Sequence, residues 1–127
     1  MKIKLSSLTV SNQDKALLFY TEKLGFIKKT EIPMGEHRWL TVVSPEERDG
    51  TELVLEPLGF EPSKVYQKQL FEAGIPATAF QVDDINAEYE RLTGLGVTFS
   101  MKPTQMGPVT IAVFDDTCGN NLQIYQL

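Results

Sequence analysis

The sequence is poor in the residue types that build most reactive sites: its 127 residues include one cysteine, one histidine and one tryptophan. The lone cysteine, Cys118, cannot form an internal disulfide, which favours a reducing compartment, and we expect a cytoplasmic protein. No local sequence motif indicates a Cys-His catalytic pair, because Cys118 and His37 are 81 positions apart. The chain also lacks the GxGxxG, GxxxxGKS/T, GxSxG and CxxC motifs.

Long hydrophobic runs and an excess of positive charge are missing as well. No apolar stretch approaches the roughly 18–20 residues that cross a bilayer. The N-terminal MKIKLSSLTV is too short and too interrupted for a signal sequence. The 17 acidic residues outnumber the 12 basic ones, for a net charge of −5, whereas nucleic-acid binding usually needs a basic patch. We therefore expect no membrane partner and no nucleic-acid partner.

The sequence does contain an approximate internal repeat. In both copies the end of a strand is followed by a polar helix cap, an amphipathic helix and a Leu-Gly pair. A period near 70 suits two half-size modules, each too small for an adequate core of its own. We therefore predict one domain, residues 1–127, in which two modules pack around a cleft that is a natural ligand site. The matched residues are Val10 and Val82, 72 positions apart, and three pairs 71 apart, Ala16 and Ala87, Leu24 and Leu95, Gly25 and Gly96.

Apolar periodicity predicts the order βαβββ in module one, about residues 1–57. Its helix should be capped by Ser11 or Asn12 and should end near Leu24. A turn is expected at Pro33-Met34-Gly35. The expected strands are at about 3–10, 26–32, 37–43 and 51–56.

The pattern then predicts a connecting helix and a second βαβββ module. The connecting segment, about 58–76, should hold a short helix with Val65, Leu70 and Phe71 turned inward. Module two, about 77–127, should have a helix capped by Asp83 or Asp84. The fold class is therefore α+β, with strands of module two at about 77–82, 97–101, 108–115 and 121–126.

Several phrases of the sequence resemble one known superfamily. They are TVSNQDKALLFYTEKLGF, TELVLEP, FQVDDINAEYERLTGLGV and FDDTCGNNLQIYQ, which together extend over essentially the whole chain. With the internal duplication they resemble the vicinal oxygen chelate superfamily, which includes glyoxalase I, extradiol dioxygenases, fosfomycin-modifying transferases and bleomycin-binding resistance proteins. The resemblance implies a curved, mixed, mostly antiparallel sheet around a ligand cleft, helices outside, and commonly a homodimer.

The same resemblance locates four inward strand positions where metal-dependent members carry histidine, glutamine or glutamate. These positions align with Leu5, Glu52, Ala77 and Gln123, and the 71-residue spacing of Glu52 and Gln123 supports their pairing. Leu5 and Ala77 have no donor atom, whereas a divalent metal centre needs three or four ligands. We therefore expect neither a metal nor another cofactor at this location.

Strand alternation predicts which side chains line the cleft instead. In HRWLTVV either His37, Trp39 and Thr41 or the alternate residues from Arg38 to Val42 face inward. We prefer the first set, because the alternate residues match the helix-facing apolar pattern. The predicted ligand-binding residues combine hydroxyls, amides, a carboxylate and two aromatic rings, and they are Ser7, Thr9, Trp39, Thr41, Glu52, Val54, Gln81, Gln123 and Tyr125.

Such a lining suits a small organic ligand with several hydrogen-bonding groups and a flat or apolar part. One hypothesis is a metal-free binding protein that sequesters or senses this ligand. A second is an enzyme related to lyases, isomerases or dioxygenases, whose metal would need donors recruited from His37, Glu56 or Tyr125. A metal-free enzyme would use Glu52 as the catalytic general base, with Gln123 or Tyr125 stabilising an oxyanion. A third hypothesis is a vestigial cleft in a protein that acts through dimer or partner contacts. Glu56 is expected at the rim of the cleft.

Overall fold

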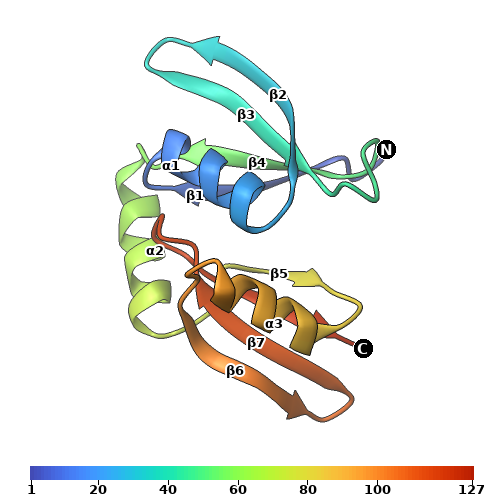
Figure 1. Ribbon diagram of the computed structural model, residues 1–127. Helices are drawn as coiled ribbons and strands as arrows, with labels where there is room; N and C mark the ends of the chain where they lie inside the picture. The colour runs from blue at the N-terminus through green and yellow to red at the C-terminus, as the bar shows by residue number, and fades with distance from the viewer. The chain divides into compact units, whose positions relative to one another are not determined.

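The computed structural model describes residues 1–127, and the chain divides into two compact units, Met1–Val65 and Tyr66–Leu127. Each unit contains one four-stranded sheet with a helix against it (Figure 1). The predicted α+β class and the repeated βαβββ order are confirmed. None of the helices has the length and apolar composition needed to cross a membrane.

The first unit has a sheet in the order β1-β4-β3-β2, in which β1 and β4 are parallel and the other neighbours antiparallel. The sheet face toward α1 carries the core of this unit, led by Val10, Leu40 and Leu55 at 0% exposure. α1 contacts both β3 and β4. The elements are β1 Leu5–Val10, α1 Gln13–Leu18, a π-helical turn η1 at Phe19–Lys23, β2 Ile27–Met34, β3 His37–Val43 and β4 Glu52–Pro57.

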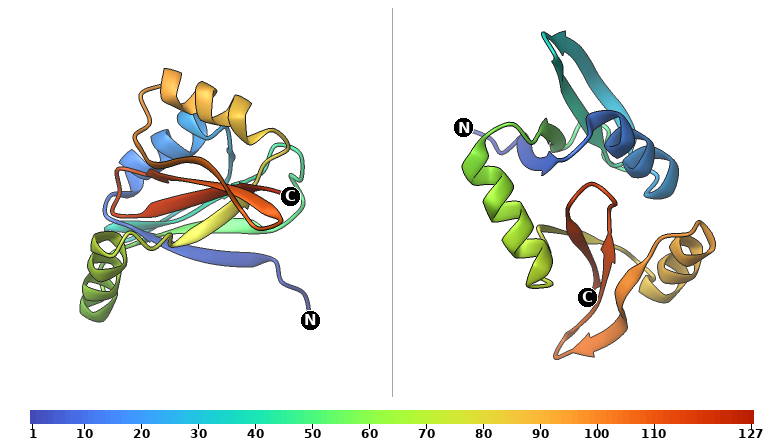
Figure 2. Two further views of the ribbon diagram at one scale, coloured as in Figure 1. Left: turned by 90° about the horizontal axis from the view of Figure 1, so that it is seen from below. Right: turned by 90° about the vertical axis from the view of Figure 1, so that its left-hand side faces the viewer.

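The second unit repeats this plan with the sheet order β5-β8-β7-β6. Figure 2 shows α3 lying across one face of this sheet, and the buried Phe114, Leu122 and Ile124 fill that side. The ring of Phe114 lies 5.3 Å, centroid to centroid, from Phe99. The elements are β5 Thr78–Gln81, α3 Ile85–Gly94, β6 Phe99–Met106, β7 Val109–Asp115 and β8 Asn121–Gln126, and α2 Glu61–Glu72 crosses the boundary between the units.

Asn12 and Asp84 are the helix caps, rather than the alternatives Ser11 and Asp83. The side chain of Asn12 accepts a hydrogen bond from the Lys15 amide, and Asp84 accepts one from the Ala87 amide. The two caps are 72 residues apart, but the Leu-Gly pairs after the helices are 71 apart. The first helix therefore contains one additional residue, and the π-helical turn η1 accommodates it.

This extra residue changes which positions of the two helices correspond. Ala16 is fully buried, whereas Ala87 is exposed. The expected equivalence of these alanines is therefore wrong, because the 72-residue offset of the caps persists until the π-helical turn.

Two strands extend beyond their expected ends and include a proline. β2 continues to Met34 and β6 to Met106, and the first turn is made by Gly35 and Glu36. Pro33 and Pro103 are compatible with these strands because β2 and β6 are the edges of their sheets and pair on one side only.

The buried residue of α2 is a polar one. Gln67 is 9% exposed, whereas Val65 and Phe71 are 53% and 39% exposed, so the expectation that these two turn inward is wrong. The Gln67 amide donates a hydrogen bond to the Asn120 side chain at 3.2 Å. Gly119 lies so close to Gln67 that a Cβ there would come within 2.6 Å of its Oε1 atom. This close polar packing explains why Gln67 takes the inward position.

Candidate functional site

The first sheet has a face turned away from α1, which we call the α1-distal face. Residues opposite each other on paired strands share a face, and the pairs Leu5–Glu52, Ser7–Val54, Thr9–Glu56 and Thr41–Val54 define this one. Trp39 and His37 follow from alternation with Thr41. The preferred inward set of HRWLTVV therefore lies on the same face as Glu52. Six predicted ligand-binding residues come together here, Ser7, Thr9, Trp39, Thr41, Glu52 and Val54.

Two carboxylates on this face are held by hydroxyl groups. The Thr41 hydroxyl donates to Glu52 Oε1 at 2.7 Å, and the Ser7 hydroxyl donates to Glu56 Oε1 at 3.2 Å. Thr41 is fully buried, and both glutamates are half-buried. Neither carboxylate has an ion-pair partner within the chain. Their charges are therefore left for solvent or a ligand.

The second sheet has a corresponding α3-distal face that is neutral. Gln123 lies opposite Ala79 and Val113, and Tyr125 lies opposite Gln81 and Ile111. The remaining three predicted site residues therefore share one face of this unit. No hydrogen bond within the chain involves the side chain of Gln81, Gln123 or Tyr125.

The strand pairing corrects the expected equivalence of Glu52 and Gln123. Gln123 pairs with Ala79 and Val113, whose counterparts at a 72-residue offset are Ser7 and Thr41. Both of these pair with Val54, not with Glu52. Glu56 likewise occupies the position of Tyr125.

The reason for this shift is the length of one loop. Residues 44–51 separate β3 from β4, whereas residues 116–120 separate β7 from β8, so the first loop is three residues longer. The difference in residue number between equivalent positions of the two units therefore falls from 72 before this loop to 69 after it. Glu56 therefore shares the α1-distal face with Glu52 and Val54.

The α1-distal and α3-distal faces also carry apolar residues that the sequence reading missed. Ile32 pairs with Trp39, and Met101 pairs with Val113. Ile32 is 53% exposed, and Met34 near it is 62% exposed. Alternation of residues with period two continues through Pro33 and could have predicted that Ile32 and Met34 share this face. The proline instead led to the prediction of a turn.

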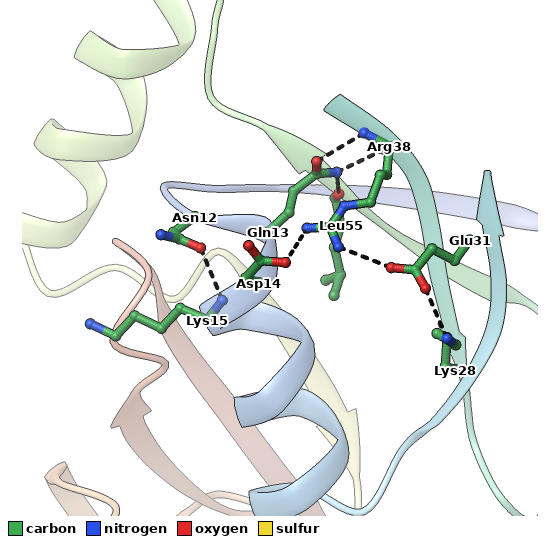
Figure 3. Close-up of polar contacts among 8 residues, drawn as sticks. All are labelled: Asn12, Gln13, Asp14, Lys15, Lys28, Glu31, Arg38 and Leu55. Atoms are coloured by element: carbon green, nitrogen blue, oxygen red, sulfur yellow. Dashed lines mark hydrogen bonds and ion pairs between the residues drawn. The ribbon is translucent and has the colours of Figure 1, made fainter. Parts of the chain in front are cut away.

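On the opposite side of the first sheet, a buried glutamine joins α1 to two strands (Figure 3). The Gln13 amide donates to the backbone carbonyls of Arg38 and Leu55, both at 2.8 Å, and its carbonyl accepts from the Arg38 amide at 3.1 Å. The β3–β4 ladder has two pairs and ends with Thr41 and Val54. If it continued, Arg38 would face Pro57, which has no N–H to donate. The Gln13 carboxamide therefore replaces the missing peptide partner.

Arg38 also organises a chain of charges beside Gln13. Its guanidinium contacts Asp14 at 2.6 Å and Glu31 at 2.9 Å, and Glu31 contacts Lys28 at 2.9 Å. The hydrogen bond from Lys28 is the main cause that lowers the pKa of Glu31, and Arg38 acts in the same direction. The hydrogen bond to Asp14 is the main cause that raises the pKa of Arg38.

Glu31→Gln should lower the melting temperature at neutral pH and have no effect in strong acid. Because the folded-state pKa of Glu31 is lowered, its stabilising contribution is complete above the unfolded pKa and disappears as the pH falls through the folded pKa. The two melting curves should therefore converge as the pH falls below the folded-state pKa of Glu31, which lies under the ordinary value for glutamate. Calorimetry from pH 7 to pH 2.5 measures this, with Glu36→Gln in the adjacent turn as the charge-matched control. A constant difference at every pH would show that the effect is not electrostatic.

Comparison with known proteins agrees with this fold. Residues 2–124 match the family model described as the Glyoxalase/Bleomycin resistance protein/Dioxygenase superfamily. The chain belongs to this superfamily. The Bacillus subtilis (strain 168) protein YurT is 61% identical over 126 residues, which cover 99% of each chain.

Two solved structures of similar chains add to this. The crystal structure of UcmS2 has a TM-score of 0.84 and 35% identity, and the match covers 98% of this chain and 97% of that one. TnmS3, an antibiotic binding protein from Streptomyces sp. CB03234, has a TM-score of 0.77 and 28% identity, with coverage of 99% and 95%. This superfamily member is thus similar to a protein that binds an antibiotic.

The donor set of this superfamily member does not fit a metal at the four aligned positions. Leu5 lies opposite Glu52, so one carboxylate has a hydrocarbon neighbour there. In the second unit the amide of Ala77 donates to the backbone carbonyl of Asn121, so Ala77 and Gln123 are not partners. The chain contains no group of three or more histidine, cysteine, aspartate or glutamate side chains that could hold a metal ion. A divalent centre would lack ligands.

Proposed function

We propose that the protein binds a small organic molecule through the α1-distal and α3-distal faces of its sheets, without a metal. The observation that carries this proposal is the set Gln81, Gln123 and Tyr125, whose polar side chains share a face and have no hydrogen-bond partner in the chain. Polar groups placed among apolar strand residues are the usual means of orienting a small ligand. The similarity to the antibiotic binding protein TnmS3 supports the same function.

A ligand screen tests this function. We expect thermal-shift and calorimetric screening of antibiotics and aromatic metabolites to find a ligand whose affinity is unchanged by a chelator. Gln123→Leu and Tyr125→Phe should each weaken that ligand by about tenfold, the usual cost of one lost hydrogen bond. The exposed Gln69→Leu on α2 serves as the matched control. Affinity that disappears with the chelator, or that ignores both substitutions, would contradict the proposal.

A second candidate function is metal-free proton transfer with Glu52 as the base. The observation in its favour is the 2.7 Å hydrogen bond that orients the Glu52 carboxylate beside the buried Thr41. A positioned carboxylate can remove a proton next to a carbonyl group. Glu52→Gln keeps the size of the side chain, so it should abolish any such turnover while the circular dichroism spectrum stays the same. Full activity in this variant would reject Glu52 as the base.

We infer further that the protein acts in the cytoplasm as a homodimer. The single buried cysteine and the absence of any disulfide are consistent with a reducing compartment, and the resemblance of the sequence to dimeric superfamily members supports the assembly. Light scattering on purified protein should give twice the 14.3 kDa chain mass.

A further inference from the structure

We propose that an organic cation binds at the open end of the β3–β4 ladder, between the indole of Trp39 and the carboxylate of Glu56. This proposal rests on the proposed ligand-binding function of the α1-distal face and specifies the charge of the ligand. We call the three residues Gln13, Trp39 and Glu56 the open ladder end.

Trp39 and Glu56 lie just beyond the last pair of the β3–β4 ladder. The last pair of the β3–β4 ladder on the α1-distal face is Thr41 with Val54. One step of alternation along each antiparallel strand leads to Trp39 on β3 and Glu56 on β4. These two residues are therefore register neighbours on one face, but no ladder pair joins them.

The second unit has no such opening. The corresponding residues there are Ile111 and Tyr125, and they are paired in a β7–β8 ladder of six pairs. The first unit therefore combines an opened ladder with an aromatic ring and an acid at the place where the second unit is closed and uncharged. Figure 1 shows the β2–β3 hairpin bending away from β4 toward its far end.

The opening follows from the residues at positions 13 and 57. Pro57 cannot donate to Arg38, and Gln13 satisfies both backbone groups of Arg38 from the α1 side. The separated strands are therefore held in place with their polar groups bonded. The open ladder end is a fixed feature that needs no ligand to form.

The side chains of Trp39 and Glu56 have the chemistry to bind a cation. Glu56 is half-buried and accepts one hydrogen bond, from Ser7, with no cation of the chain beside it. The nearest basic residue in the register, Arg38, points to the other face and is already paired with Asp14 and Glu31. A carboxylate and an aromatic ring on the same face of a sheet can together hold an alkylammonium group, through charge attraction and through cation–π contact.

The test uses choline as the cation and 3,3-dimethylbutan-1-ol as its uncharged isostere. Trp39 is the only tryptophan, so its fluorescence reports directly on this position. We expect a saturable change with choline and a response to the alcohol at least tenfold weaker in affinity. Glu56→Gln should weaken choline at least tenfold, and Trp39→Leu, followed by calorimetry, should do the same. Glu46→Gln, an exposed acid in the β3–β4 loop, should leave the affinity within twofold.

Three outcomes would overturn the inference: no saturable response to choline, equal binding of the alcohol, or wild-type affinity in a folded Glu56→Gln protein. Circular dichroism and urea titration of each variant separate lost binding from lost folding. If choline fails while the ligand found by screening still depends on Gln123 and Tyr125, the inference is wrong and the proposed function remains. If the screen also finds nothing, the proposed function itself fails.

Discussion

Gln13→Leu is expected to lower the free energy of unfolding by about 3 kcal/mol, because a buried backbone group left without a partner costs about 1–3 kcal/mol. The substitution removes the carboxamide that bonds the carbonyls of Arg38 and Leu55 and the amide of Arg38. Leucine has a similar volume, so packing changes little and the polar loss dominates. Urea denaturation followed by circular dichroism measures the effect. Gln69→Leu, on the exposed side of α2, should change stability by less than about 0.5 kcal/mol.

The second unit supplies a rescue for this variant. There the position of Gln13 is taken by Ile85, and the position of Pro57 is taken by Gln126, whose backbone pairs with Thr110. The double variant Gln13→Ile with Pro57→Gln should therefore recover more than half of the loss, because the new N–H can donate to Arg38. A double variant no more stable than Gln13→Leu would show that the glutamine does not stand in for the ladder.

Asp116→Ala is expected to be at least as damaging, at about 3–4 kcal/mol, because hydrogen bonds to a charged group contribute about 1.5–3 kcal/mol and this residue makes several. Asp116 is fully buried in the loop between β7 and β8. Its carboxylate accepts from the backbone of Cys118 at 2.7 Å, and from the backbone and side chain of Asn120, both at 2.9 Å. Asn120 in turn accepts from Gln67, so the loss should also loosen α2.

Two measurements separate this effect from a general loss of charge. Hydrogen exchange should quicken in residues 116–120 and in the part of α2 around Gln67 before global unfolding. Asp83→Ala removes an exposed acid of the same unit and should leave both exchange and stability nearly unchanged. Similar behaviour of the two variants would mean that the buried carboxylate does not organise the loop.

The local features of the fold were predictable from the sequence because they depend on neighbouring residues. The caps at Asn12 and Asp84 and the glycines after the helices follow from short-range chemistry. The side of the sheet that carries Trp39 and Thr41 followed from alternation alone.

The register of β4 was not predictable in this way, because it depends on bonds to strands distant in the sequence. The phrases around Glu52 and Gln123 look alike and are 71 residues apart, but their neighbours across the sheet differ. The longer loop 44–51 shifts one strand by three residues relative to the repeat. Local similarity gives no weight to such a shift, so Glu52 rather than Val54 was aligned with Gln123.

The burial of Gln13 is a second feature that could not be predicted from the sequence. A glutamine in the first turn of a helix looks like a solvent-exposed residue, and nothing nearby indicates that it is 8% exposed. The signal was present in two distant places, namely Ile85 at the matching helix position and Pro57 at the matching strand position. Only the strand pairing shows that the glutamine at position 13 compensates for the proline at position 57, whereas the second unit has neither residue at the matching positions.

The prolines of β2 and β6 have a consequence for behaviour at high concentration. Each sheet ends in a strand whose outer backbone groups would otherwise accept a strand from another molecule. Pro33 and Pro103 remove a donor from these outer strands, and the shifted registers beside Lys28 and Met101 twist the strands away from a flat form. Addition of a strand from another molecule is therefore disfavoured at β2 and β6, and in the first unit this protected edge is the one that carries the exposed Ile32 and Met34.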